Sequence, residues 1–285
     1  MEVFYQVKEI NNFLAKGNSF NDFAFIPTMG NLHEGHLSLI KAASSKFNNI
    51  IVSIFINPAQ FGKDEDFDRY PRTREQDIEI IKSLSCVDVI FIPSKQELYP
   101  FGVDGAAKIS IDPLSRELCG NTRHGHFEGV LTVVLRLLNL FSPKAIYLGK
   151  KDYQQYILIK QMVADLFLDI EVHGCPIIRA DGLALSSRNQ YLANEEQEKA
   201  KFLNKYLVEC SNEIRHCSER GAVNLICDKY VKSLASKGLV CEYLELRSAE
   251  NLSTIMSLNK DDLLVLLAAI RIGKTRLIDN VEFSF

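Results

Sequence analysis

The sequence has no apolar run approaching the roughly 20 residues that a helix needs to cross a bilayer. Its first residues, MEVFYQ, contain no basic segment followed by an apolar core, so we expect no signal peptide. The seven cysteines form no Cys-x-x-Cys pair, and their odd number does not suit a disulfide framework. These absences favour free thiols in a reducing compartment, and we expect a cytoplasmic protein with no membrane partner.

The sequence also lacks an excess of charge of one sign. Its 33 basic and 36 acidic side chains leave a net charge of −3, which argues against non-specific binding to nucleic acid, although a local basic patch stays open. Hydrophobic residues make up 47% and charged residues 24%, as in ordinary globular proteins. A chain of 285 residues suffices for one large domain or two smaller ones.

Up to about residue 180, short apolar runs alternate with helical patterns. The runs are rich in Val, Ile and Phe and predict strands buried on both faces, over residues 23–27, 50–56, 87–92, 145–148 and 170–178. The segments between them predict helices over residues 35–45, 72–84, 128–140 and 153–167. This alternation predicts an α/β fold with a Rossmann-like, doubly wound, mostly parallel sheet, whose ligands bind beyond the carboxyl ends of the strands.

After about residue 190 the pattern changes to helices followed by strands. We expect a long charged helix over residues 194–219, with Asn194 as its N-cap, and a second helix over 222–236 that ends at Gly238. Strand-like runs follow at residues 240–246, 263–270 and 275–278. The sequence therefore predicts two domains: a Rossmann-like domain over residues 1–177 and a smaller α+β domain over 178–285.

The most informative segment is PTMGNLHEGH at residues 27–36. A strand that ends in a tight glycine turn and opens a helix is a phosphate-binding arrangement, because free N–H groups at the helix start point toward the anion. His33 and His36 add donors that would stabilise the charge of a phosphoryl-transfer transition state. Two other interpretations are a zinc site, although the spacing is not that of H-E-x-x-H, and two histidines that cap a turn.

Three further segments lie at or just past predicted strand ends. In SIFINPAQF (53–61), amide side chains fall at the carboxyl edge of the second strand, although Asn-Pro is also an ordinary turn. YLGKKDYQQ (147–155) repeats the order strand, glycine, polar turn and helix, with a lysine-rich loop as the alternative. GLALSSRN (182–189) offers two hydroxyls and an arginine in a flexible, glycine-led loop, which suits a triphosphate.

Together these segments resemble the pantothenate synthetase (pantoate–β-alanine ligase) family, a group of nucleotidyltransferases with an HIGH-type motif. The resemblance runs over residues 27–280 and rests on segments in the same order along the chain: 27–36, 52–61, 70–73, 126–130, 151–155, 182–189 and 273–280. The sequence departs from the usual family pattern at four positions, where Asn31 replaces Ala, His124 Pro, Lys150 Glu and Leu185 Met.

The resemblance implies ATP-dependent ligation of (R)-pantoate and β-alanine. Pantoate would attack the α-phosphate of ATP to give pantoyl adenylate and pyrophosphate, and β-alanine would then give pantothenate and AMP. It further implies Mg²⁺ with ATP, no metal site of the protein's own, a homodimer, and a second domain that acts as a lid over a nucleotide- and pantoate-binding first domain.

The resemblance also implies roles for individual residues. Catalytic roles would fall to His33, His36 (the proton donor), Lys151 and Arg188. ATP would contact Met29, Gly30, Asn31, Leu32, His33, Glu34, Gly35, His36, Gly149, Lys150, Lys151, Asp152, Ile178, Leu185, Ser186, Ser187 and Arg188. Pantoate or β-alanine would contact Pro27, Thr28, Asn57, Gln60 and Gln155. Two alternatives stay open, namely a different adenylyltransferase that makes a dinucleotide cofactor and a non-enzymatic nucleotide sensor.

Overall fold

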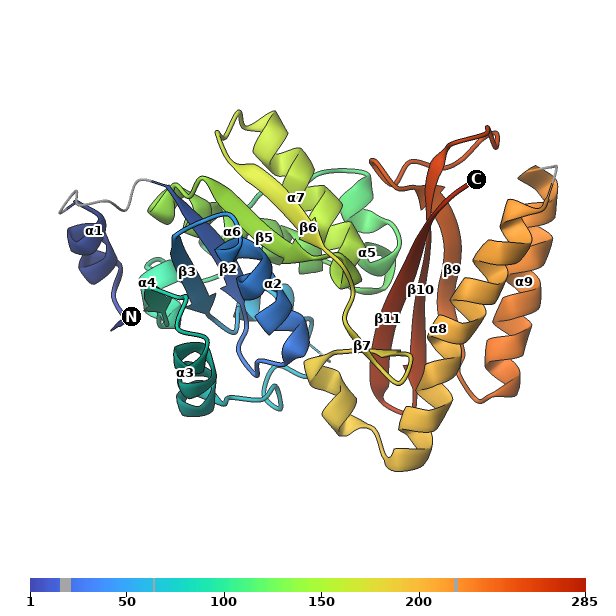
Figure 1. The fold of residues 1–285 in the computed structure, drawn as a ribbon, viewed down its shortest axis with the longest axis horizontal. Coiled ribbons are helices and arrows are strands. Elements are labelled where there is room, and N and C mark those ends of the chain that lie inside the picture. Colours follow the sequence, from blue (N-terminus) through green and yellow to red (C-terminus); the bar gives the residue numbers. More distant parts are fainter. Residues whose placement is uncertain (16–21, 64, 218–219) are drawn as a thin grey trace. The chain divides into compact units, whose positions relative to one another are not determined.

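The computed structural model describes residues 1–15, 22–63, 65–217 and 220–285, which form two compact units (Figure 1). The first comprises Met1–Lys150 and Leu158–Pro176, and the second comprises Lys151–Ile157 and Ile177–Phe285. From the sequence we expect a boundary at residue 177; in the structure, Lys151–Ile157 also groups with the second unit. None of the helices in this described part combines the length and apolar character that a membrane span requires.

The first unit is built on a six-stranded sheet in which every neighbouring pair of strands is parallel. The predicted doubly wound sheet is therefore confirmed. Strand β6 ends earlier than predicted because Pro176 cannot continue the ladder. The sheet order is β1-β4-β3-β2-β5-β6, with β1 (Glu2–Phe4), β2 (Phe23–Thr28), β3 (Asn49–Ile54), β4 (Val89–Phe91), β5 (Ala145–Gly149) and β6 (Glu171–Cys175).

Helices cover both faces of this sheet. Alternation along β2 sends Ala24 and Ile26 into one apolar cluster with α2 and α3, and sends Phe25 to the other face, where its ring centroid lies 5.0 Å from that of Phe141 in α6. The predicted helices are confirmed to within about two residues at each end. The helices are α1 (Val7–Ala15), α2 (Glu34–Ser44), α3 (Arg74–Ser83), α4 (Lys95–Leu98), α5 (Cys119–Thr122), α6 (His126–Phe141) and α7 (Tyr153–Asp165).

The strand order fixes where a ligand can bind to this sheet. The chain runs outward from β2 to β3 and β4, then returns to the other side of β2 for β5 and β6. The order therefore reverses between β2 and β5, and the connections at the carboxyl ends of these strands diverge there. Single-turn 3-10 helices follow two of the strands, η1 (Pro58–Gln60) after β3 and η3 (Lys150–Asp152) after β5.

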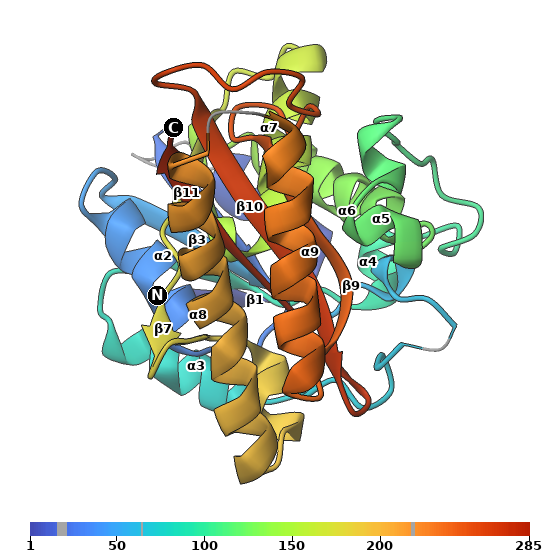
Figure 2. The same cartoon turned by 90° about the vertical axis from the view of Figure 1, so that its right-hand side faces the viewer.

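The second unit contains a three-stranded antiparallel sheet of β9 (Val240–Ser248), β10 (Leu263–Ile272) and β11 (Thr275–Ser284). Helices α8 (Asn194–Arg215) and α9 (Arg220–Ser236) lie side by side against it (Figure 2). The predicted α+β character is confirmed. Strand β11 is longer than predicted because its whole length pairs with β10, from Thr275 opposite Ile272 to Ser284 opposite Leu263.

The predicted N-cap of α8 is wrong. Ala193 occupies the cap position and Asn194 is the first helical residue. The helix start is held by Glu196, whose carboxylate accepts the backbone N–H of Ala193 at 2.9 Å. This carboxylate accepts the N–H of the cap residue itself, whereas an N-cap side chain would accept an N–H from within the first turn. The predicted helix end at 219 lies outside the described residues, and the α-helix ends at Arg215.

Candidate active site

The two histidines of the 27–36 segment lie at the start of α2, just beyond the carboxyl end of β2. His33 is the N-cap, and its Nδ1 accepts the backbone N–H of Gly35 at 3.1 Å. The Nδ1 of His36 accepts the backbone N–H of His33 at 3.3 Å, and the two ring centroids are 4.1 Å apart. A neutral imidazole that accepts at Nδ1 carries its proton at Nε2. Both rings therefore present an Nε2–H donor.

A buried carboxylate that the sequence analysis did not single out shapes the turn before these histidines. Asp77 of α3 is 1% exposed and accepts the backbone N–H groups of Asn31 at 2.9 Å and Leu32 at 2.8 Å. It holds Asn31 at a φ of 51° and Gly30 at 80°, in the left-handed region. A Cβ on Gly30 would lie 2.9 Å from the Asp77 carboxylate. Glycine is therefore required at this position for two reasons, the left-handed backbone and the lack of space for a side chain.

These contacts correct one expectation from the sequence. The phosphate-binding interpretation required free N–H groups at the helix start, but those of Asn31, Leu32, His33 and Gly35 all donate within the protein. That interpretation is therefore wrong for these backbone groups. The backbone contacts at Nδ1 leave the ring proton of each histidine on Nε2, so each imidazole carries an oriented side-chain donor.

The amide of Gln60 lies beside the same turn. Gln60 follows β3 on η1, is 8% exposed, and its Nε2 lies 3.1 Å from the Met29 sulfur. Its Oε1 accepts from Asn57 Nδ2 at 3.1 Å. These bonds use one donor and one acceptor of the Gln60 amide, which keeps one N–H and one lone pair for a ligand.

Asn57 has no such capacity left. Its Nδ2 donates to Gln60 Oε1 and to the carbonyl of Gly129 at 3.1 Å, and its Oδ1 accepts from Ala59 N at 3.2 Å and from Tyr99 Oη at 2.8 Å. Two donors and two acceptors complete the inventory of an amide. Asn57 is 1% exposed. It holds the turn that carries Gln60.

Thr28 has a similar structural part. Its hydroxyl donates to the carbonyl of Ser53 at 2.8 Å and accepts the backbone N–H of Gly30 at 3.2 Å. The side chain thus joins the ends of β2 and β3 and supports the turn before His33. Pro27, one residue earlier in β2, is partly exposed.

Gly149 ends β5 on the other side of β2, and Lys150 follows it as the first residue of η3. Gly149 pairs with Cys175 at the end of β6. Burial raises the pKa of Cys175, and the nearby Lys150 ammonium acts in the opposite direction. Lys150 therefore places a positive charge at the carboxyl edge of the sheet.

The remaining predicted site residues belong to the second unit. Those at positions 151–155 come first, and β11 contacts them through Asn280. Lys151 Nζ lies 3.6 Å from Asp152 Oδ2, and the Lys151 carbonyl accepts from Asn280 Nδ2 at 3.2 Å. Gln155, one turn into α7, is partly exposed. Asp279, next to Asn280, is 3% exposed and forms a bidentate ion pair with Arg179. Burial raises the pKa of Asp279, and the Arg179 guanidinium opposes that shift.

The predicted flexible loop at 182–189 is an ordered hairpin followed by a 3-10 helix. Strands β7 (Arg179–Ala180) and β8 (Leu183–Ala184) are joined by Asp181 and Gly182, both with positive φ, as a two-residue type I′ turn requires. The backbone N–H of Leu185 donates to the carbonyl of Ile178 at 3.0 Å. This hydrogen bond places Ile178 and Leu185, which the sequence analysis expects to contact the nucleotide, side by side.

The hydroxyl and guanidinium groups follow on η4 (Ser187–Tyr191). Ser186 is its N-cap, and its Oγ accepts the backbone N–H of Arg188 at 3.3 Å. Ser187 is 8% exposed. The local structure thus brings Ser186, Ser187 and Arg188 into one turn of helix.

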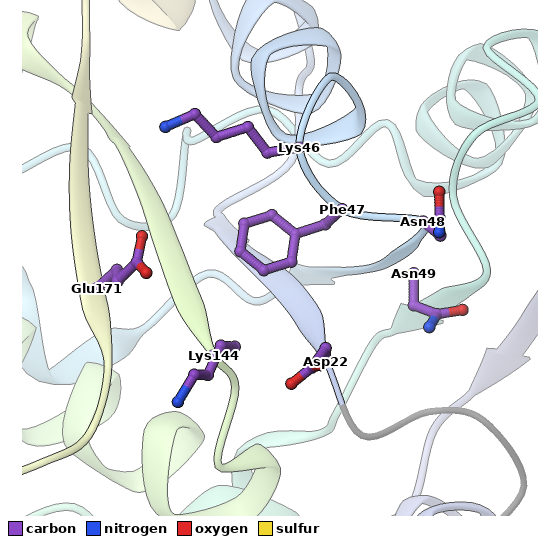
Figure 3. Close-up of a pocket in the computed structure, with 7 residues that line it drawn as sticks. All are labelled: Asp22, Lys46, Phe47, Asn48, Asn49, Lys144 and Glu171. Atoms are coloured by element: carbon purple, nitrogen blue, oxygen red, sulfur yellow. The ribbon is translucent and has the colours of Figure 1, made fainter.

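A cavity of about 500 Å³ lies at the amino ends of the strands of the six-stranded sheet, opposite the ends that carry the histidines (Figure 3). Its lining includes Asp22 before β2, Asn49 at the start of β3, Lys144 before β5 and Glu171 at the start of β6. These are the amino ends of the strands, whereas ligands of open α/β sheets bind at the carboxyl ends. None of the site residues expected from the sequence lines this cavity.

A parallel α/β sheet whose order reverses beside a strand–turn–helix element is typical of nucleotide-binding α/β proteins. Comparison with known proteins narrows this class. The family model described as pantoate-beta-alanine ligase matches residues 2–282. The chain belongs to the pantoate–β-alanine ligase family.

Individual relatives agree with this assignment. A pantothenate synthetase of Pseudomonas fluorescens is 41% identical over 280 residues, covering 98% of this chain and 96% of the relative, and one of Neisseria meningitidis is 43% identical over 100% and 99%. The crystal structure of pantothenate synthetase from Thermus thermophilus superposes with a TM-score of 0.89 at 35% identity, covering 99% of both chains. A Francisella tularensis pantoate-beta-alanine ligase, described as complexed with beta-gamma ATP and beta-alanine, gives 0.80 at 36% identity, covering 99% and 97%.

Proposed function

We propose that this chain ligates (R)-pantoate to β-alanine, using ATP and forming pantoyl adenylate as the intermediate. Membership of the ligase family supports the reaction, and the Francisella relative bound to an ATP ligand and β-alanine supports two of the three substrates. The observation that carries the proposal is the pair of imidazoles, His33 and His36. Backbone N–H groups hold their Nδ1 atoms at the carboxyl end of β2, where the strand order of the sheet reverses.

In the first step a carboxylate oxygen of pantoate forms a bond to the α-phosphorus of ATP, and the bond to the pyrophosphate oxygen breaks. Negative charge builds up on the phosphate oxygens during this step. The Nε2–H groups of His33 and His36 are suited to stabilise that charge, because orientation by the backbone removes the need to reorganise during the reaction. Lys151 and Arg188 of the second unit are the cations that we assign to the phosphates.

In the second step the amine of β-alanine attacks the acyl carbon of the adenylate. The new C–N bond replaces the C–O bond to AMP, and the nitrogen releases a proton as the amide forms. Neither step needs a nucleophile from the enzyme, so catalysis rests on position and charge. Gln60 and Gln155 are assigned to pantoate.

Several residues serve this proposal indirectly. Thr28 and Asn57 have their polar atoms engaged within the protein, so we assign them to support of the site instead of contact with the substrates. The remaining nucleotide contacts are assigned to segments that carry small or polar groups, namely Met29–Leu32, Glu34, Gly35, Gly149, Lys150, Asp152, Ile178 and Leu185–Ser187.

Mg²⁺ is assigned to the nucleotide itself. Within the residues that the structure describes, no group of three His, Cys, Asp or Glu side chains could hold a metal ion. Mg²⁺ usually keeps several waters and binds through substrate phosphates, which needs few protein ligands. The imidazole, ammonium and guanidinium donors assigned above would bind the phosphate oxygens that Mg²⁺ does not coordinate.

The proposal extends to a homodimer in the cytoplasm. All seven cysteines carry free thiols in the structure, which suits a reducing compartment. The dimer rests on the family resemblance. Light scattering on a size-exclusion column tests it: twice the chain mass of 32.3 kDa supports the dimer, and a single chain mass contradicts it.

A coupled assay for AMP tests the reaction. We expect AMP release that requires pantoate, β-alanine and ATP together, and ATP–pyrophosphate exchange that requires pantoate alone. Exchange supported by another acid or by a mononucleotide would instead identify a different adenylyltransferase. Nucleotide binding without release of AMP or pyrophosphate would identify a sensor and refute the proposal.

A further inference from the structure

A polar network lies behind Gln60, among residues to which the proposed function gives no role. We propose that Glu65, Arg123 and His126 form a positioning device that fixes the backbone of Gln60 and thereby sets the affinity for the acid substrate. The inference rests on the proposed function, because that function assigns Gln60 to pantoate.

The outer part of the network is a bidentate ion pair. Arg123 Nε lies 2.6 Å from Glu65 Oε1, and its Nη2 lies 2.8 Å from Oε2. The side chains are only 12% and 23% exposed. Burial alone would raise the pKa of Glu65, but the hydrogen bonds and charge of Arg123 lower it to about 2. The pair is therefore charged throughout the working pH range, and its fork geometry fixes the guanidinium.

The inner part of the network fixes the tautomer of His126. Its Nε2 lies 2.7 Å from Arg123 Nη1, and a guanidinium can only donate, so Nε2 is the acceptor. The ring proton is then on Nδ1, which donates to the carbonyl of Gln60 at 2.8 Å. Arg123 Nη2 lies 3.5 Å from the same carbonyl. A protonated imidazole would turn a donor toward the guanidinium, so the arrangement requires neutral His126.

The side chain of Gln60 is held by a separate set of bonds. Asn57 fixes its Oε1, and Asn57 is itself held by Tyr99 and by the carbonyl of Gly129. A Cβ on Gly129 would lie 2.2 Å from the carbonyl oxygen of Ala59, so α6 and η1 are in direct backbone contact. Gln60 is thus held at both its backbone and its amide, and the two remaining hydrogen-bonding positions of the amide have a fixed direction. The network acts on substrate only through this direction.

Two substitutions of His126 separate the two hydrogen bonds of its ring. Asparagine places an amide nitrogen near the Nδ1 position and keeps the donor to Gln60, whereas glutamine places its amide near Nε2 and keeps only the contact with Arg123. We expect His126→Gln to raise the KM for pantoate in pyrophosphate exchange about tenfold, which corresponds to the loss of about one hydrogen bond. His126→Asn should raise it two- to threefold, and the KM for ATP should stay within twofold in both variants.

His173→Gln is the matched control. The His173 ring also makes a polar contact through Nε2, which lies 2.9 Å from Glu171 Oε2, but His173 lies on β6 and its ring stacks on Tyr147. We expect unchanged KM values for both substrates. Circular dichroism of each variant verifies the fold, and Glu65→Gln, on the partly exposed side of the network, replaces any His126 variant that does not fold. Equal rises in both KM values, or glutamine and asparagine variants that match the control, would overturn the inference.

A second measurement does not depend on catalysis. A ¹⁵N spectrum of histidine-labelled protein, with His126 assigned from the variants, distinguishes the two neutral tautomers. We expect His126 to carry its proton on Nδ1 and to change tautomer or protonate in Arg123→Met. An Nε2–H tautomer in the unsubstituted protein would refute the network even if the enzyme is active. An enzyme that fails to exchange pyrophosphate with pantoate would refute the proposed function and leave this measurement valid.

Discussion

Replacing Asp77 tests whether a buried carboxylate holds the catalytic turn. In Asp77→Asn the amide oxygen can accept one of the two backbone N–H groups, from Asn31 or Leu32, and the amide nitrogen then faces the other donor. A buried N–H without an acceptor costs about 1–3 kcal/mol. We expect the free energy of unfolding to fall by that amount, and by roughly 2–5 kcal/mol in Asp77→Ala, where both N–H groups lose their partner.

The catalytic effect follows from the strained turn. Without the carboxylate, the left-handed conformation of Asn31 loses the bond that holds it, and the turn can relax away from the geometry that orients His33 and His36. A displacement of about 1 Å at reacting groups can lower a rate about a hundredfold. We therefore expect pantoate-dependent pyrophosphate exchange to fall about 10- to 100-fold in Asp77→Asn, measured at a temperature where the variant is folded.

Asp88→Asn is the matched control for this experiment. Asp88 also accepts a backbone N–H, that of Ile50 at 2.8 Å, but at the amino end of β3 and away from the proposed site. We expect it to lower the free energy of unfolding in urea and leave the exchange rate within twofold. If Asp77→Asn loses stability but exchanges pyrophosphate as fast as the Asp88 variant, the carboxylate supports the fold alone and our account of the turn is wrong.

Four further predictions follow from single features of the structure. His36→Ala should lower the rate of adenylate formation about a hundredfold or more, and pyrophosphate exchange near the unsubstituted rate would contradict its role. Gly129→Ala should lower the free energy of unfolding by about 1–3 kcal/mol and raise the KM for pantoate, because the added Cβ would push η1 away from α6. An unchanged midpoint of urea unfolding would contradict this prediction. Arg179→Met leaves Asp279 buried without its cation and should cost about 3–5 kcal/mol in urea unfolding, whereas a loss below about 1 kcal/mol would mean that the pair is not closed. The pKa of Glu65 in the folded protein is about 2, below its ordinary value of 4.5, so the ionised Glu65 stabilises the fold fully above about pH 4.5 and less as the pH falls toward 2. The difference in free energy of unfolding between the unsubstituted protein and Glu65→Gln should therefore shrink over that range. A difference that does not change with pH would contradict this prediction.

The strands of the first unit were predictable because they are buried on both faces. Runs such as the one that becomes β3 have no polar alternation, and that pattern is typical of a parallel sheet. Strand β1 was not predicted, because its three residues at the sheet edge are too few for any periodicity. The hairpin at Asp181 and Gly182 was predicted as a flexible loop, although an Asp-Gly pair is a strong signal for a two-residue turn.

The amino-acid sequence by itself determined the class of the sheet, the position of His33 and His36 after the first buried strand, and the family. Each of these depends on residues that are close in the chain, where spacing and burial pattern carry the information. Only the tertiary structure decided how the histidine turn and Gln60 are held, because Asp77, Asn57 and His126 form hydrogen bonds with residues 46, 72 and 66 positions away in the chain. A hydrogen bond between distant segments depends on the packed geometry of both, and local sequence patterns do not record that geometry.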